Sequence, residues 1–212
     1  MHINHFPKYA DAIELQKEVA KNVITKDILH NEIEQICGID VSYKKNTAYC
    51  SAVIMKKNTL QLIESVNTKS VVKYPYIPGL FLLRESKPIM ITLKLLKKHY
   101  DLLLIDGHGI LHTRKCGLAS YIGVLIDKPT IGVAKNLLCG SIMEDQFVQY
   151  DGAILGFRIK KEGKKQIFVS VGHKISLITA IQIVKRLIKK EEWIPEPLRI
   201  ADLNSKNHLN FD

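Results

Sequence analysis

The chain has 212 residues, of which 46% are apolar and 25% are charged. This length and composition suit one domain with a well-buried core and exclude a disordered chain. The formal net charge of +10 favours a polyanionic partner, for which nucleic acid is the first candidate, and leaves a solvated lysine-rich surface as the alternative.

The first third of the chain predicts one helix and three strands. Apolar residues at helical spacing predict an amphipathic helix within residues 8–29. Apolar runs then predict strands over 35–43, 48–55 and 60–72, with a turn at 56–58. Three consecutive strands joined by short turns predict an antiparallel meander.

An irregular segment followed by two helices comes next. Pro75, Pro78 and Gly79 exclude regular structure where they stand. A first helix is expected to begin within 80–85. A second is expected over 88–100, because it would open with a proline and proline is favoured in the first turn of a helix.

The second half of the chain alternates strands and helices. A short apolar run predicts a strand over 101–106, followed by a helix over 115–127 and a strand over 129–135. A strand, a helix and a strand in this order imply parallel pairing with a crossover. Residues 153–160 and 166–171 are predicted to form a hairpin.

The C-terminal part predicts one more amphipathic helix, over 176–190, with Ser176 as its N-cap. The tail is polar, and we expect it to fray after about residue 205. No linker divides the chain, so residues 1–212 are expected to form a single catalytic domain. A meander followed by helices and parallel strands predicts an α/β fold of the ribonuclease H-like kind, a mixed sheet flanked by helices.

The most informative segment is DLLLIDGHGILHTRKCGLAS, in which Asp106 ends an apolar strand and two glycines follow, Gly107 and Gly109. A carboxylate where a strand meets the surface is a common catalytic position in open α/β sheets. Asp40 lies inside another predicted strand, where an aspartate is costly to bury unless it is paired or binds a cation. Two such carboxylates that converge would repel each other, and Mg²⁺ or Mn²⁺ would relieve the repulsion. Pairing of Asp40 with a lysine, or exposure at a strand end, is the alternative.

Three further charged residues could join these acids. Glu85 and Asp202 could complete an acidic cluster, but each could equally be a surface carboxylate. Lys135 ends a predicted strand and could stabilise charge on a phosphate, whereas a lysine with its charged end in solvent is the commoner case.

Polar and aromatic loop residues suggest contact with nucleic acid. His112 could transfer a proton or touch phosphate, and Arg114 could bind an anion, although a loop histidine without a function is an equal alternative. Tyr76 stands in a loop stiffened by prolines, where a rigid aromatic side chain could stack on a base or wedge into a duplex. Its alternative is anchorage of the loop to the core.

Together these motifs resemble the endonuclease V family. The matching segments run in family order from about residue 35 to 203, and they are GIDVSY (38–43), PYIPGLFLLRE (75–85), DGHGILHTRKCGLAS (106–120), PTIGVAK with LCG just after it (129–140), VGHKIS (171–176) and PEPLRIAD (195–202). The resemblance implies a ribonuclease H-like fold and a DNA repair endonuclease that needs magnesium, for which manganese can substitute. Such an enzyme recognises deoxyinosine, the product of adenine deamination. It cuts the second phosphodiester bond on the 3′ side and leaves 3′-hydroxyl and 5′-phosphate ends.

The resemblance also implies roles for individual residues. The catalytic set would be Asp40, Glu85, Asp106, Lys135 and Asp202, with Asp40 and Asp106 as the metal ligands. Tyr76 matches the residue that wedges into the space left by the displaced base, and Gly109 with its turn matches the pocket for the flipped hypoxanthine. The full set expected to contact DNA is Tyr76, Pro78, Gly79, Leu80, Gly107, Gly109, His112 and Arg114.

One position departs from the family pattern. Thr113 stands where many members have proline, which could loosen the loop but leaves the histidine and arginine beside it in place. The same acids would also serve an endoribonuclease specific for inosine, or a nuclease acting on branched DNA. A nucleic-acid-binding protein that has lost its activity is a further alternative, against which the intact acids argue.

Bulk features suggest where the protein acts. None of the four cysteines forms a C-x-x-C pair, which suits a reducing cytosol. No apolar run approaches the length of a membrane span, and the N-terminus lacks the apolar core of a signal peptide. We therefore expect a cytoplasmic protein with no membrane partner, and we take a monomer as the default.

Overall fold

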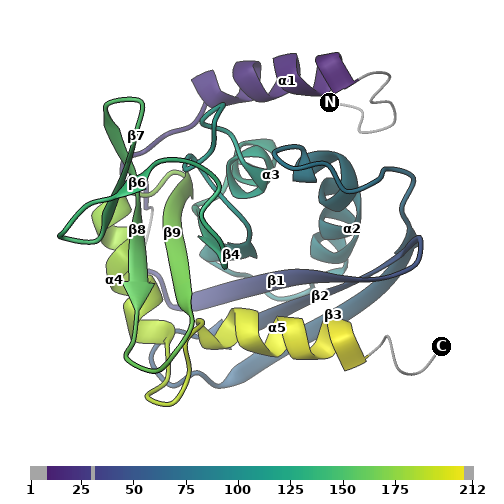
Figure 1. Cartoon of the computed structure of the whole chain (residues 1–212). Coiled ribbons are helices and arrows are strands. Elements are labelled where there is room, and N and C mark those ends of the chain that lie inside the picture. The colour runs from purple at the N-terminus through teal and green to yellow at the C-terminus, as the bar shows by residue number, and fades with distance from the viewer. Residues whose placement is uncertain (1–8, 30–31, 208–212) are drawn as a thin grey trace.

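The computed structural model describes residues 9–29 and 32–207, and its centre is a mixed sheet, for which these residues supply nine strands (Figure 1). The strand order is β3-β2-β1-β4-β5-β9-β8-β7-β6. The strands are β1 (Gln35–Lys44), β2 (Thr47–Lys56), β3 (Leu62–Val71), β4 (Leu102–Asp106), β5 (Thr130–Ala134), β6 (Ser141–Ile142), β7 (Phe147–Tyr150), β8 (Ala153–Lys160) and β9 (Gln166–His173). The predicted mixed α/β architecture is confirmed.

The first three strands form the predicted antiparallel meander. β1 pairs with β2 along its whole length, from Gln35 opposite Lys56 to Lys44 opposite Thr47, and β2 pairs with β3. The central part of β1 and nearly all of β2 are buried, which explains their continuous apolar runs. The meander therefore supplies one half of the sheet.

Parallel pairing joins the meander to the other half of the sheet. β1 runs parallel to β4, and Ile39 lies opposite Ile105. β4 runs parallel to β5, as the strand-helix-strand order predicts, and Asp106 lies opposite Val133. Because Asp40 and Asp106 each follow one residue after the pair Ile39 and Ile105, the register brings the two acids side by side on neighbouring strands.

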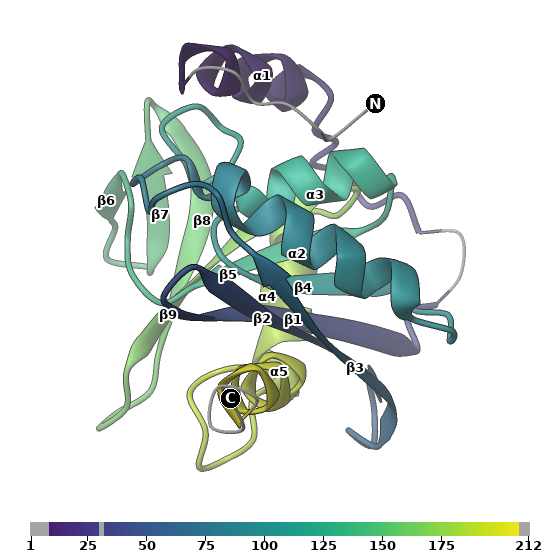
Figure 2. The same ribbon diagram turned by 90° about the vertical axis from the view of Figure 1, so that its right-hand side faces the viewer.

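Helices cover both faces of the sheet (Figure 2). They are α1 (Tyr9–Lys21), α2 (Phe81–Leu95), α3 (Leu118–Ile126), α4 (Leu177–Leu187) and α5 (Glu196–Asn207). The first three share an apolar core with Leu103 and Ile105, whereas α4 and α5 share another with Leu102 and Leu104. Alternate residues of β4 therefore face opposite helical layers. No helix among the described residues is long and apolar enough to cross a membrane.

The prediction of two helices in the segment after Gly79 was wrong. A single helix, α2, continues through Pro88, although proline supplies no backbone N–H. Leu82, Ile89 and Leu93 are buried in one core cluster on both sides of the proline. This shared burial holds the helix continuous, and the helix ends at Leu95 rather than near residue 100.

Other differences concern the length and number of elements. α1, α3 and α4 are shorter than predicted, and Ser176 is confirmed as the N-cap of α4 because its Oγ accepts from the N–H of Thr179 at 3.2 Å. The prediction missed β6, β7 and α5. Residues 206 and 207 still belong to α5, so fraying does not begin at 205, and the tail after 207 lies outside the described residues. α5 is mostly polar in sequence because only a few of its residues are buried, among them Leu198, Ala201 and Ser205.

Candidate active site

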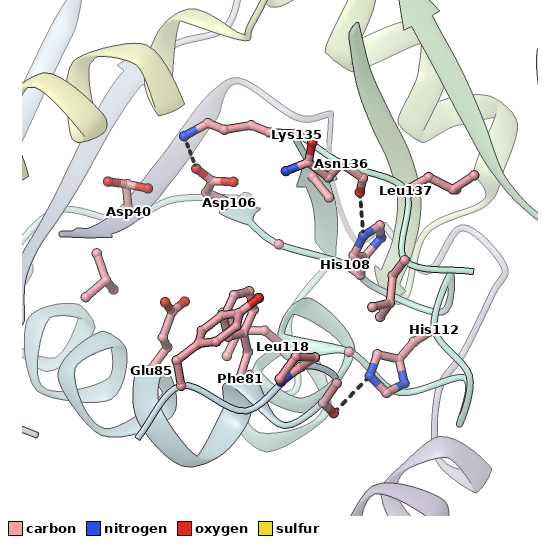
Figure 3. A pocket seen from close by; sticks show the side chains of 18 of the residues that line it. Asp40, Phe81, Glu85, Asp106, His108, His112, Leu118, Lys135, Asn136 and Leu137 are labelled. Atoms are coloured by element: carbon pink, nitrogen blue, oxygen red, sulfur yellow. Dashed lines mark hydrogen bonds and ion pairs between the residues drawn. The ribbon is translucent and has the colours of Figure 1, made fainter. Parts of the chain in front are cut away.

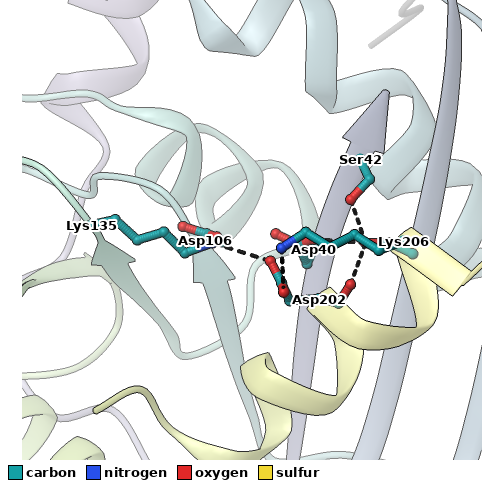
Figure 4. A network of polar contacts seen from close by, with 7 residues as sticks. Asp40, Ser42, Asp106, Lys135, Asp202 and Lys206 are labelled. Atoms are coloured by element: carbon teal, nitrogen blue, oxygen red, sulfur yellow. Dashed lines mark hydrogen bonds and ion pairs between the residues drawn. The ribbon is translucent and has the colours of Figure 1, made fainter. Parts of the chain in front are cut away.

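Three carboxylates from two strands and one helix meet at one end of β4. One ligand oxygen each of Asp40, Asp106 and Asp202 lies within 4.8 Å of the others. Asp40 comes from β1, Asp106 ends β4, and Asp202 projects from α5 (Figure 4). The structure therefore brings together three acids that are 66 and 96 residues apart in the chain.

Two lysines partly neutralise this cluster. Lys135 Nζ lies 2.5 Å from Asp106 Oδ2 and 3.2 Å from Asp202 Oδ1. Lys206 Nζ lies 2.6 Å from Asp202 Oδ2. Although burial alone raises the pKa of Asp202, the contacts with Lys206 and Lys135 hold that pKa below its ordinary value. Burial lowers the pKa of Lys135, but Asp106 and the other acids raise it by more, so the lysine is a stable cation.

Asp40 is the acid that gains least from these cations. Burial and the neighbouring Asp106 raise its pKa to about 7, against the smaller effects of Lys135 and a hydrogen bond. That bond comes from Ser205 Oγ, which donates to Asp40 Oδ2 at 2.9 Å and lies 2.7 Å from Ser42 Oγ. Hard oxygen donors with uncompensated negative charge suit a divalent cation such as magnesium.

A close approach of α5 to β1 makes this cluster possible. A Cβ at Gly38 would lie 2.4 Å from the carbonyl carbon of Pro197, which belongs to the first turn of α5. Because Gly38 lacks a side chain, α5 can lie directly on β1. Asp202 then reaches Lys135 and the acids on the strands, and Ser205 reaches Asp40.

Glu85 lies on α2, apart from the three-acid cluster (Figure 3). It is buried, and burial together with repulsion from Asp106 and Asp40 raises its pKa to about 8. Tyr43 Oη donates a hydrogen bond to Glu85 Oε1 at 3.1 Å. This raised pKa favours the protonated carboxyl of Glu85 when no cation is bound beside it.

A pocket of about 400 Å³ opens next to the acids (Figure 3). Of the residues predicted for the site, its lining includes Asp40, Tyr76, Pro78, Gly79, Glu85, Asp106, Gly107, His112 and Lys135. Asp202, Leu80, Gly109 and Arg114 are not part of that lining. Several residues that were not predicted also line it, among them Gln16, Phe81, Asn136 and Leu138. The size suits a small planar ligand such as a base.

The segment 76–79 forms the rim of this pocket. The Tyr76 side chain is 58% exposed and packs edge-to-face on Phe81, with ring centroids 5.0 Å apart. A ring with this exposure has surface available to contact another ring. Leu80, in contrast, is buried in the core and anchors the segment.

Three side chains converge on the carbonyl oxygen of Gly79. Gln16 Nε2 lies 3.2 Å away, His112 Nε2 3.0 Å and Arg114 Nη2 2.6 Å. Burial and the charge of Arg114 lower the pKa of His112 to about 4, so the ring is neutral. Its Nε2–H donates to Gly79, and its Nδ1 accepts from the N–H of Arg114 at 3.1 Å. Gly79 has φ of +76°, and an added Cβ would lie 3.0 Å from Arg114 Nη2, so glycine is required there.

Gly109 has a packing role in the structure. A Cβ at this position would lie 2.0 Å from the carbonyl oxygen of Val171 on β9. Glycine therefore lets the loop after β4 lie against β9. His108 beside it lines the pocket; burial lowers its pKa to about 4, and its Nε2 donates to the carbonyl of Asn136 at 2.9 Å.

Gln16 and Ser205 belong to the site but were not predicted from the sequence. Gln16 is 1% exposed, accepts from Arg114 Nε at 2.7 Å and donates to Cys116 O at 2.7 Å. A polar residue between the buried Ala12 and Val19 on one helical stripe is the signal that points to it. Ser205 stands three residues after Asp202, and one helical turn places both on one side of α5.

Comparison with known proteins shows the family of this chain. The model of the endonuclease V family matches residues 17–203. The chain belongs to the endonuclease V family. It is 42% identical to endonuclease V of Thermofilum pendens over 193 residues, which cover 89% of this chain and 83% of the relative. Endonuclease V of Dictyoglomus thermophilum is 37% identical over 212 residues, or 96% of this chain and 92% of the relative.

Solved structures of the family confirm the ribonuclease H-like mixed fold. Endonuclease V from Streptomyces avermitilis superposes with a TM-score of 0.87 at 30% identity, over 96% of this chain and 94% of that one. Endonuclease V of Ciona intestinalis superposes with a TM-score of 0.85 at 30% identity, over 95% of this chain and 98% of that one. That protein was solved in complex with a 24mer DNA containing an inosine followed by a ribo-adenosine.

Proposed function

We propose that this chain is a magnesium-dependent DNA repair endonuclease that recognises deoxyinosine and hydrolyses the second phosphodiester bond on its 3′ side. The observation that carries the proposal is the cluster of Asp40, Asp106 and Asp202 beside a base-sized pocket with an exposed tyrosine at its rim. Family membership and the inosine-containing DNA bound to the Ciona relative support the same substrate.

Asp40 and Asp106 are the proposed metal ligands, with Asp202 beside them. Their fit to a divalent cation rests on the raised pKa of Asp40 and on the approach of the three oxygens to within 4.8 Å. A bound Mg²⁺, or Mn²⁺ in its place, supplies Lewis-acid polarisation of the phosphodiester. The three carboxylates would hold this ion beside the pocket.

Lys135 and Glu85 would act on the phosphate from two directions. The ammonium of Lys135 lies 2.5 Å from Asp106 Oδ2, and beside a phosphate held at the acids it would offset the negative charge that grows on the phosphoryl oxygens during hydrolysis. Glu85 lines the same pocket and has a pKa of about 8 when no cation is bound. A cation beside it would lower this pKa toward neutral pH, where the carboxyl could take or release a proton. Tyr43 keeps the carboxyl of Glu85 in place.

The pocket would hold the altered base outside the duplex. Hypoxanthine pairs weakly, so moving it out of the stack costs less than moving a normal base. Tyr76 would fill the gap in the duplex. We assign His112 and Arg114 to holding the Gly79 carbonyl, since their hydrogen-bonding groups point to it.

The alternative function is cutting of inosine-containing RNA with the same groups. The matched substrates are oligonucleotides with one central deoxyinosine, one inosine in RNA, or neither, each with and without magnesium. We expect magnesium-dependent cutting one nucleotide beyond deoxyinosine, and cutting of RNA alone would assign the protein to RNA metabolism. Asp106→Asn should abolish cutting while inosine-containing DNA still binds. Full activity of that variant would refute the metal-site assignment.

A further inference from the structure

The hairpin of β8 and β9 projects from the sheet at the end that carries the acids. Asp106 lies opposite Val133, and Val133 lies opposite Val169 of β9. The β8–β9 turn begins beyond the pair Lys160 and Gln166, three residues further along the sheet. At about 3.3 Å per residue, the turn stands about 10–13 Å beyond the level of Asp106.

This turn carries a concentration of positive charge. Residues 160–165 read Lys-Lys-Glu-Gly-Lys-Lys, which gives four lysines against one glutamate. Lys160, Lys164 and Lys165 are exposed. Among the described residues, Lys160 and Lys164 have no ion pair with a carboxylate. Their ammonium groups are therefore available to an external anion.

The turn is fastened to the rest of the molecule. Lys161 Nζ donates to the backbone carbonyls of Lys189, Lys190 and Glu192, at 2.7, 3.3 and 3.1 Å. Lys165 Nζ stands 5.6 Å from the ring centroid of Trp193. These contacts hold the turn against the segment between α4 and α5. A fastened turn presents its lysines in fixed positions, whereas a loose one would not.

The position of the turn relative to the acids sets how far along a nucleic acid it can reach. β9 and β8 are two and three strands from β4, which is about 10–14 Å at 4.8 Å per strand. Combined with the projection beyond Asp106, the lysines stand about 14–19 Å from the acids. At 3.4 Å of duplex axis per base pair, this corresponds to about four to six base pairs.

We propose that Lys160, Lys164 and Lys165 form a second contact surface, which binds the phosphate backbone of duplex DNA about four to six base pairs from the phosphate at the acids. The proposal rests on the proposed function for the position of the cut. It goes beyond that function because the contact needs no lesion. The alternative is that these lysines are solvated and contact no partner.

The test measures binding rather than cutting. Lys160→Gln, Lys164→Gln and Lys165→Gln are combined in one variant. Lys161 is kept because its three hydrogen bonds are the main contacts that fasten the turn, whereas Lys165→Gln removes only the ring contact with Trp193. The matched control combines Lys94→Gln, Lys97→Gln and Lys98→Gln, which remove three exposed lysines from the opposite end of β4. Fluorescence anisotropy in EDTA follows each protein on an undamaged 30-base-pair duplex and on a short duplex with deoxyinosine. The short duplex extends only three base pairs on either side of the bond to be cut and is closed at both ends by uncharged linkers so that it stays paired.

Each phosphate contact contributes about 0.9 to the slope of log affinity against log salt. The hairpin variant should lose about 2–3 of this slope and at least tenfold in affinity on the long duplex at ~0.1 M salt. On the short duplex it should equal the wild type, and the control should equal the wild type on both. Urea unfolding should give the same midpoint for all three proteins.

Three results would overturn the proposal: an unchanged salt slope, an equal loss in the control, or an equal loss on the short duplex. The undamaged duplex gives this answer even if no inosine is cut, so failure of the proposed function and failure of the second surface are told apart. With deoxyinosine substrate at saturation, the hairpin variant should cut at the wild-type rate, because its lysines do not touch the acids.

Discussion

Replacing Asp40 by asparagine tests whether this acid is held ready for a cation. Without a metal, burial and Asp106 raise the pKa of Asp40 to about 7, compared with about 3.9 in an unfolded chain. Each pKa unit corresponds to about 1.36 kcal/mol, so ionised Asp40 destabilises the folded state by about 4 kcal/mol above pH 7. Asparagine has nearly the same shape, can still accept from Ser205, and carries no charge.

Whether Asp40 stabilises or destabilises the folded protein depends on which state, folded or unfolded, keeps its proton. Between about pH 4 and pH 7, folded Asp40 keeps a proton that the unfolded chain has released. Stability from this group is therefore fully present below pH 4 and is lost as the pH rises to 7. Asp40→Asn should equal the wild type at pH 3 and be more stable by about 2 kcal/mol at pH 5 and about 4 kcal/mol at pH 8.

Urea unfolding in EDTA at these three pH values measures the difference in stability, and Mg²⁺ should then reduce this difference. A cation at one hundred times its Kd stabilises the wild type by about 2.7 kcal/mol, and the variant should gain less because it lacks one carboxylate ligand. Glu162→Gln removes an exposed carboxylate and serves as the control. The reasoning fails if Asp40→Asn is less stable than the wild type at pH 8 in EDTA, or if the difference does not depend on pH.

Three further variants test lesion binding and metal binding separately. Tyr76→Ala should weaken binding of deoxyinosine DNA by about 1–3 kcal/mol of lost stacking, and unchanged affinity and selectivity in a binding titration would reject the wedge role. Gln16→Met should leave Arg114 Nε unsatisfied, lower the free energy of unfolding by about 1–3 kcal/mol and weaken lesion binding, whereas the exposed neighbour in Lys17→Met should change neither. Gly38→Ala should displace α5 and reduce the thermal stabilisation by Mg²⁺; an unchanged thermal shift would show that α5 tolerates the methyl group.

Most strands of the sheet could be predicted because their apolar residues form local sequence patterns. Asp40 and Asp106 could be placed near each other for the same reason, since each ends or interrupts an apolar run whose pairing brings such positions together. Asp202 is different, because α5 is polar and its position depends on Gly38 in a strand more than 150 residues earlier. No local pattern reports such a contact.

The helices that the sequence analysis misjudged have a common cause. Proline at position 88 disfavours a continuous helix locally, yet burial of Leu82 and Ile89 in the same core outweighs the missing hydrogen bond. α5 has few apolar residues, yet it packs on the sheet over Gly38. In both cases tertiary contacts decide a structure against the local preference, and these are the contacts that a single sequence does not display.

Two helices on opposite faces of the sheet support different parts of the site. α1, on one face, supplies Gln16, which helps to fix the carbonyl of Gly79 at the pocket rim. α5, on the other, supplies Asp202 and Ser205 to the acids. Because neither helix contacts the other's target, a variant of Gln16 should alter lesion binding with the metal site intact. A variant of Gly38 should weaken Mg²⁺ binding and leave lesion binding intact. Titrating both variants with DNA and with Mg²⁺ measures these two opposite effects.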